Sequence, residues 1–151
     1  MQSKILLVGQ APARESDGKP LEGRIGERIA SLAGITVEQY LYRTDRMNVL
    51  NQYPGRSKGK GDAFPMKEAK LAVSKKAHVF SGRLVVFLGK STAWVFGASA
   101  SQYLTWRYSS ALCCWFAVLP HPSGIVRWWN SKDNKRQPAD FLHSLLGGVS
   151  P

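Results

Sequence analysis

The stretch Leu84-Val85-Val86-Phe87-Leu88-Gly89 decides the fold of this chain, because it places an unbroken apolar run directly before a glycine. A short apolar run that is bounded by a turn residue is typical of a strand buried on both faces. Three further stretches share this character: Lys4 to Gly9, Met47 to Leu50, and Cys114 to Leu119 ahead of Pro120. The sequence therefore predicts four buried strands.

Helical patterns separate these strands, with apolar residues recurring every three or four positions. The predicted helices run from Ile25 to a stop at Gly34, from a capping box of Thr36 and Gln39 to Tyr42, from Asp62 to Phe80, from a cap at Ser91 to Phe96, and from Pro138 in a first turn to Gly147. Buried strands that alternate with helices predict an α/β fold. We expect a three-layer α/β/α sandwich with a central four-stranded parallel sheet, formed by residues 1–151 as a single domain.

Two further groups of side chains are expected to have structural roles. Trp94, Trp106 and Trp115 are predicted to lie in the core, where their large rings bury apolar surface. Lys75 and Lys76 are predicted to lie on the solvated face of their helix.

The charge of the chain points to a polyanionic partner. Its 151 residues include 21 Lys and Arg against 10 Asp and Glu, and no acidic residue occurs between Ala69 and Lys132. An excess of this size favours nucleic acid as the partner. No apolar run approaches the roughly 18 residues of a membrane helix, and the apolar run near the N-terminus is too short for a signal peptide. We therefore expect a cytoplasmic monomer that does not bind membranes.

The loops that follow the strands are the places to look for function, since ligands of parallel sheets bind outside the carboxyl ends of the strands. Gly9-Gln10-Ala11-Pro12 follows the first strand and leads into a glycine-rich segment from Gly18 to Gly26. Asn48 ends the second strand. Pro120-His121-Pro122-Ser123-Gly124 follows the last strand.

These loops, in this order, resemble the uracil-DNA glycosylase superfamily. The shared elements are Gly-Gln-Ala-Pro after the first strand, Pro20-Leu21-Glu22-Gly23 with Gly26, Asn48, Leu88-Gly89 and His121-Pro122-Ser123. The pattern is similar to the branch that contains the iron–sulfur enzymes, and it spans nearly the whole chain. The resemblance implies a sheet in which the second strand lies outside the first, followed by the third and the fourth.

The resemblance also implies roles for particular residues. His121 would donate a hydrogen bond to the base oxygen on which negative charge develops, and Gln10 would hold the attacking water. Asn48 carries both an amide donor and a carbonyl acceptor, which suits the edge of a uracil-like base. Base contacts are also expected from Ala11, Pro12, Leu21 and Glu22.

A base inside a duplex must be turned out before it can be cleaved, and the resemblance places that step after His121. Ile125 or Val126 would fill the gap in the duplex, while Arg127, Ser123 and Gly124 would contact phosphates. Further contacts to the DNA are expected from Arg56, Lys58, Lys60 and Lys90.

Several residues depart from the family pattern. Leu21 replaces the aromatic residue that stacks on the base, and Glu22 is an unexpected acid that could act on the water or recognise a substituent of the base. The only cysteines, Cys113 and Cys114, cannot supply the four ligands of an iron–sulfur cluster, so we expect no metal and no cofactor. Besides a monofunctional DNA glycosylase acting on uracil or a modified pyrimidine, two alternatives stay open. One is a non-catalytic DNA-binding member. The other is a hydrolase of free modified nucleotides in a viral pathway of base modification, and the compact, basic chain without cluster cysteines is compatible with a viral origin.

Overall fold

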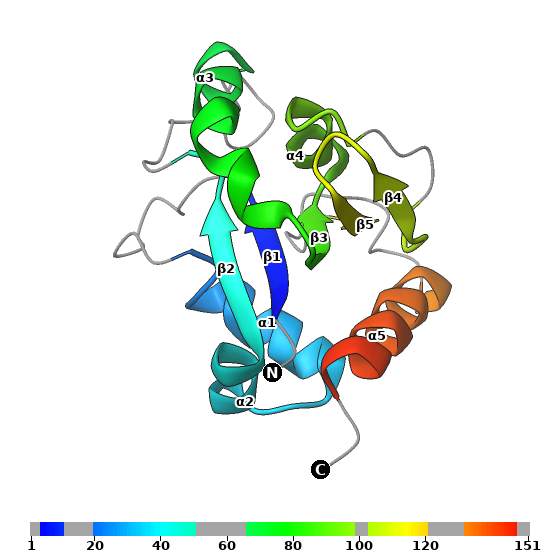
Figure 1. The fold of residues 1–151 in the computed structure, drawn as a ribbon. Helices are drawn as coiled ribbons and strands as arrows, with labels where there is room; N and C mark the ends of the chain where they lie inside the picture. Colours follow the sequence, from blue (N-terminus) through cyan, green and yellow to red (C-terminus); the bar gives the residue numbers. More distant parts are fainter. Residues whose placement is uncertain (1–3, 11–19, 51–65, 99–102, 121–131, 148–151) are drawn as a thin grey trace, which may run out of the picture.

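A computed structural model describes residues 4–10, 20–50, 66–98, 103–120 and 132–147 (Figure 1). The strands are β1 (Ile5–Gly9), β2 (Thr44–Asn48), β3 (Leu84–Leu88), β4 (Arg107–Ser109) and β5 (Cys114–Leu119). The helices are α1 (Arg24–Ala33), α2 (Val37–Arg43), α3 (Met66–Lys76), the short 3₁₀ helix η1 (Ala77–Phe80), α4 (Lys90–Val95) and α5 (Lys132–Leu146).

The strands form one five-stranded sheet in the order β2-β1-β3-β5-β4. The pairs β1–β2, β1–β3 and β3–β5 are parallel, which confirms the α/β class and the strand order implied by the resemblance. The predicted count of four strands was wrong, because β4 pairs antiparallel with β5 at the edge of the sheet. Its three residues carry no apolar run, so no pattern in the sequence marked them as a strand.

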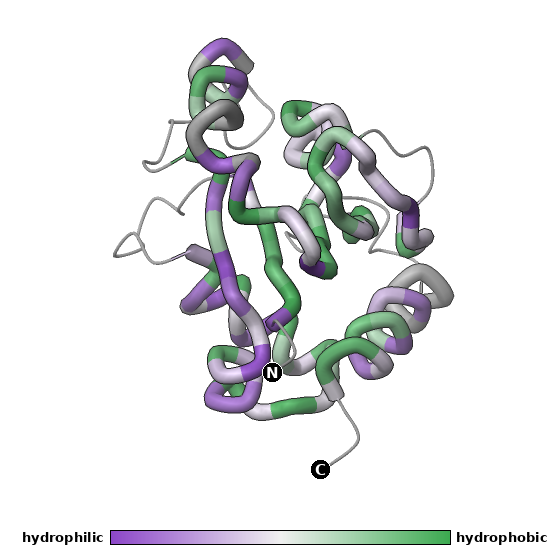
Figure 2. Tube along the Cα trace, viewed as in Figure 1, coloured by the Kyte–Doolittle hydropathy of each residue, from purple (hydrophilic) through white to green (hydrophobic). Residues whose placement is uncertain are grey.

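Helices cover the sheet on both faces, as the continuous apolar strands predict. On one face, side chains of β1, β3 and β5 pack with α3, η1 and α4 around Phe87. On the other face, alternate residues of the same strands pack with α1, α2 and α5 around Leu7. Figure 2 shows the resulting contrast between the apolar inner strand β1 and the outer strand β2, which carries hydrophilic residues.

Local signals set the bounds of the first two helices. Gly34 ends α1 with a φ of 73°, a left-handed conformation that glycine adopts without strain. Thr36 and Gln39 form the expected capping box of α2, each side chain bonding to the other residue's backbone N–H at 3.0 Å. Both predictions are confirmed. The glycine and the capping box together define where α1 ends and where α2, which leads into β2, begins.

Other local predictions were wrong. Gly89, not Ser91, lies at the N-cap of α4, and Pro138 lies inside α5 instead of in its first turn. Trp94 and Trp115 were expected in the core, yet they are 51% and 50% exposed. Trp106 is partly buried, and its ring contacts Phe141 of α5 at a centroid distance of 5.7 Å.

Candidate active site at the carboxyl ends of the strands

The carboxyl ends of four parallel strands meet at one edge of the sheet. The register pairs Gly9 with Asn48 and Leu88 with Leu119, so the segments after β2, β1, β3 and β5 start side by side. Backbone bonds continue this pairing beyond the strands, since the N–H of Gly89 donates to the carbonyl of Leu119 at 2.7 Å. This edge is where an open α/β sheet binds its ligand.

Asn48 lies at the end of β2 with its side chain turned toward Gly9. Only 5% of the residue is exposed, and its Oδ1 accepts no hydrogen bond from any described residue. A Cβ atom added at Gly9 would lie 2.7 Å from this oxygen, so the glycine is needed for the close approach. A buried carbonyl oxygen without a donor is energetically costly, and it is therefore an acceptor available to a ligand.

Gln10 follows directly after β1, one residue beyond the Gly9 that pairs with Asn48. Its carbonyl oxygen accepts a hydrogen bond from the backbone N–H of Leu50 at 2.8 Å, and the carbonyl of Gly9 accepts one from Val49 at 2.9 Å. The backbone segments that carry Gln10 and Asn48 are thus bonded to each other past the end of the regular sheet. The side chain of Gln10 is partly exposed at this edge.

Leu21 is brought to the same place from the segment between β1 and α1. A Cβ atom at Gly9 would also lie 2.7 Å from Leu21 Cδ2, so Leu21 and the Asn48 amide meet over the same glycine. Leu21 has a φ of 55°, a conformation that is uncommon outside glycine. The Tyr40 hydroxyl holds it there by donating to the Leu21 carbonyl at 2.8 Å. Gly26 permits this contact, because a Cβ there would lie 2.8 Å from the same carbonyl oxygen.

The family follows from a match over most of the chain. Residues 1–144 match the family model of the Uracil DNA glycosylase superfamily. The chain belongs to the uracil DNA glycosylase superfamily. A search among curated proteins gave no match. Because this superfamily consists mostly of DNA glycosylases, membership supports a glycosylase-like function with DNA as the partner, and it confirms the resemblance and the fold class drawn from the sequence.

In this glycosylase fold, Glu22 lies beside the clamp formed by Tyr40 and Leu21. Burial raises the pKa of the Tyr40 hydroxyl well above its usual range, with Arg46 opposing the rise in pKa and the Glu22 carboxylate adding to it. The phenol therefore stays protonated and keeps donating to the Leu21 carbonyl. Glu22 is partly buried and directly follows Leu21.

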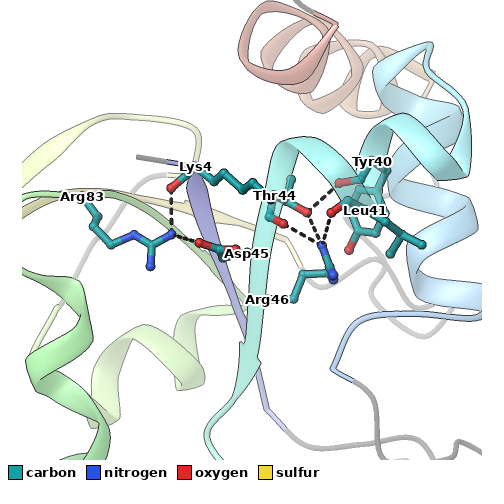
Figure 3. A network of polar contacts seen from close by, with 7 residues as sticks. All are labelled: Lys4, Tyr40, Leu41, Thr44, Asp45, Arg46 and Arg83. Atoms are coloured by element: carbon teal, nitrogen blue, oxygen red, sulfur yellow. Dashed lines mark hydrogen bonds and ion pairs between the residues drawn. The ribbon is translucent and has the colours of Figure 1, made fainter. Parts of the chain in front are cut away.

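Polar side chains of β2 contact the end of α2 (Figure 3). Thr44, Arg46 and Asn48 are every second residue of β2, so their side chains lie on the same face of the strand. Arg46 Nη1 donates to the carbonyls of Leu41 and Thr44 at 3.1 and 2.7 Å, and its guanidinium lies 5.6 Å from the centre of the Tyr40 ring. The contacts connect the end of α2 to the strand that carries the amide.

Lys76 belongs to the site although the sequence placed it on a solvated face. The residue is partly buried, and its Nζ donates to the carbonyl oxygens of Asn48 and Val49 at 2.9 and 3.0 Å. Burial lowers the pKa of this ammonium. Its neighbour Lys75 offers the same side chain, so nothing in the sequence distinguished the two.

Lys90 begins α4, immediately after the carboxyl end of β3. Its Nζ lies 4.6 Å from the centre of the Tyr103 ring, and burial raises the pKa of that phenol. The side chain of Lys90 is exposed at the edge of the sheet that carries Gln10 and Asn48. This location suits the predicted contact with DNA.

The structure places Gln10, Leu21, Glu22, Asn48 and Lys90 of the predicted site. The remaining predicted residues lie outside the described residues: Ala11, Pro12, Arg56, Lys58, Lys60, His121, Ser123, Gly124, Ile125, Val126 and Arg127. Within the described ranges, no three His, Cys, Asp or Glu residues gather as metal ligands would. None of the helices in that same part of the chain has the length and apolar character that a bilayer crossing requires.

Proposed function

We propose that this chain is a monofunctional DNA glycosylase that hydrolyses the bond between deoxyribose and uracil or a modified pyrimidine. The observation that carries the proposal is the Asn48 amide, buried at the carboxyl end of β2 with an oxygen that lacks a donor among the described residues. The imide N–H of a uracil-like base is the donor that such an oxygen would accept. Superfamily membership supplies the reaction class.

In the proposed reaction, water adds to C1′ of the sugar while the bond from C1′ to N1 of the base breaks. The electron pair of that bond leaves with the base, so negative charge grows on the base oxygens. His121, as a neutral imidazole, would donate a hydrogen bond to one of them. Gln10 would orient the water by hydrogen bonding alone, since a glutamine side chain cannot accept a proton. The proton that the water releases would pass to solvent, and the departing base anion would take up a proton from solvent to complete the hydrolysis.

Leu21 is the residue that bears on the choice of base. In place of an aromatic ring it offers an aliphatic side chain packed over Gly9. Losing a base–aromatic stack weakens binding by about 1–3 kcal/mol. A branched aliphatic side chain also has a different shape from a flat ring, so we propose that a pyrimidine with a substituent is accepted along with uracil. Glu22 beside it would serve as an acceptor for a polar substituent.

The test incubates the protein with duplex and single-stranded oligonucleotides carrying uracil, 5-hydroxymethyluracil or a bulkier pyrimidine, and separately with the free nucleotides. Mass spectrometry of the released base is the readout. Release from DNA with an intact abasic strand supports the proposal. Binding without release would instead identify a non-catalytic member, and release from mononucleotides alone would identify a nucleotide hydrolase.

A variant pair ties the activity to the proposed site. His121→Ala should reduce turnover far more than DNA binding, because its hydrogen bond strengthens only as the base departs. His78→Ala is the matched control, since His78 is an exposed residue of η1. Equal turnover in the two variants would contradict the role of His121.

A further inference from the structure

Lys76 reaches the candidate site from the opposite face of the sheet. It is the last residue of α3, which packs on the face away from α1 and α2. The other described lysines of this helix are directed elsewhere: Lys67 is exposed, and Lys70 Nζ lies 5.0 Å from the centre of the Trp94 ring. Only Lys76, among these three, donates to the backbone of β2.

The two acceptors of Lys76 are consecutive carbonyls at the end of an outer strand. Successive carbonyls of an extended strand point to opposite sides, so their convergence on one ammonium requires the chain to turn after Asn48. On the other side, the N–H groups of Val49 and Leu50 donate to the carbonyls of Gly9 and Gln10. The backbone that carries the amide is therefore held from both sides, by β1 and by Lys76.

This arrangement matters because the direction of an amide decides what it recognises. Only 5% of Asn48 is exposed, and its Oδ1 faces Gly9. A rotation of the backbone at this residue would carry the amide away from the glycine. Hydrogen bonds from a charged donor are stronger than neutral ones, so the ammonium resists that rotation.

We propose that Lys76 is a positioning residue for base recognition, whose ammonium fixes the carbonyls of Asn48 and Val49 and so aims the Asn48 amide. The inference rests on the proposed function for its consequence in catalysis. Its structural part concerns the orientation of the amide, and this part can be measured in the absence of any substrate.

The experiment compares Lys76→Met with Lys67→Met, which removes the same charge from an exposed position of the same helix. We expect Lys76→Met to lower kcat/KM for base release from the oligonucleotide by about tenfold or more, the size expected for losing hydrogen bonds from a charged donor. We also expect Lys76→Met to reduce the difference in kcat/KM between one pyrimidine and another. Binding to an undamaged duplex should fall equally in the two variants. Lys76→Arg should restore most of the preference, because a guanidinium can donate to two carbonyls.

A second measurement keeps the two proposals apart. If the wild-type protein releases no base, the proposed function fails, and the NMR signals of the Asn48 side-chain amide then decide the role of Lys76. A shift of these signals in Lys76→Met but not in Lys67→Met supports the positioning role. Unchanged signals, or an unchanged base preference in an active protein, would overturn it. Should the methionine variant not fold, Lys76→Gln replaces it in both measurements.

Discussion

The two faces of the sheet differ in the kind of side chain that they bury. The face covered by α3, η1 and α4 holds a cluster of four phenylalanines with centroid distances of 4.8 to 5.9 Å: Phe80, Phe87, Phe96 and Phe116. The face covered by α1, α2 and α5 is aliphatic at its centre, and along β2 it becomes polar through Thr44, Arg46 and Asn48.

This difference separates stability from recognition. A packed aromatic cluster gains free energy from burial alone and presents no group to a ligand. The polar row along β2 gains less from burial, yet it ends at the amide that we assign to base recognition. Substitutions on the two faces should therefore have different signatures, and four of them test whether the separation holds.

The largest effect is expected for Phe87→Ala in the aromatic cluster. Phe87 is fully buried, so truncating it should lower the free energy of unfolding by about 3–5 kcal/mol in denaturant titrations. The base preference of the molecules that remain folded should not change. Leu84→Ala in the same strand is the control, because 43% of Leu84 is exposed and its loss should have little effect. A changed base preference in Phe87→Ala would show that the faces are not separate.

Gly9→Ala should act on the opposite face and on function. The added methyl group would lie 2.7 Å from both Asn48 Oδ1 and Leu21 Cδ2, so both side chains must move. We expect a loss of about 1–3 kcal/mol in stability, typical of overpacking, together with a loss of base release. Base release at the wild-type rate by the folded variant would contradict the place given to this glycine.

Tyr40→Phe tests the clamp on Leu21. Removing the hydroxyl leaves the buried Leu21 carbonyl without its 2.8 Å hydrogen bond, which should cost about 1–2 kcal/mol of stability. Tyr42→Phe is the control, since Tyr42 is 77% exposed. Discrimination between uracil and substituted pyrimidines should change only in Tyr40→Phe. If both variants discriminate like the wild type, the clamp has no part in recognition.

The smallest effect that we expect is a pH dependence of the folding stability, caused by Cys114 on the aromatic face. Burial raises the pKa of the Cys114 thiol from 9.0 to about 11, with Cys113 adding to the rise. Above pH 9 the unfolded chain releases this proton before the folded one does, so folding stability falls as pH rises from 9 toward 11. Between pH 9 and 10 we expect a loss of about 1 kcal/mol that Cys114→Ala does not show. Parallel pH curves for the two proteins would indicate that the thiol is not shielded from water.

The sequence predicts the inner part of this fold better than its margins. Three of the four predicted runs became the parallel strands β1, β3 and β5, because an unbroken apolar run can be buried on both faces only inside a covered sheet. The bounds of the second strand were wrong, since β2 is Thr44–Asn48 and not Met47 to Leu50, and its outer position lets it carry polar residues. At the margin, β4 depends on pairing with β5, and Trp115 is exposed although it is the second residue of an otherwise buried strand. Such features depend on which neighbour covers them, and no local pattern carries that information.

The same distinction applies to the site. Asn48 and Gln10 could be brought near each other before the structure was known, since Asn48 ends β2, Gln10 follows β1, and the family resemblance implies that these strands are neighbours. The contact of Lys76 with β2 joins residues 28 positions apart, and the clamp of Tyr40 on Leu21 joins residues 19 positions apart. Neither contact leaves a sequence pattern, because a lysine or a tyrosine on a helix has many possible partners.

The outer position of β2 has a consequence for the behaviour of the protein at high concentration. A bare sheet edge is a template on which a second chain can add a strand, the first step of edge-to-edge aggregation. Here the carbonyl of Asn48 at the end of β2 and the carbonyl of Val49 just beyond it already accept hydrogen bonds from Lys76. The lysine that aims the recognition amide thereby also occupies two carbonyls at this end of β2 that a second chain would otherwise meet.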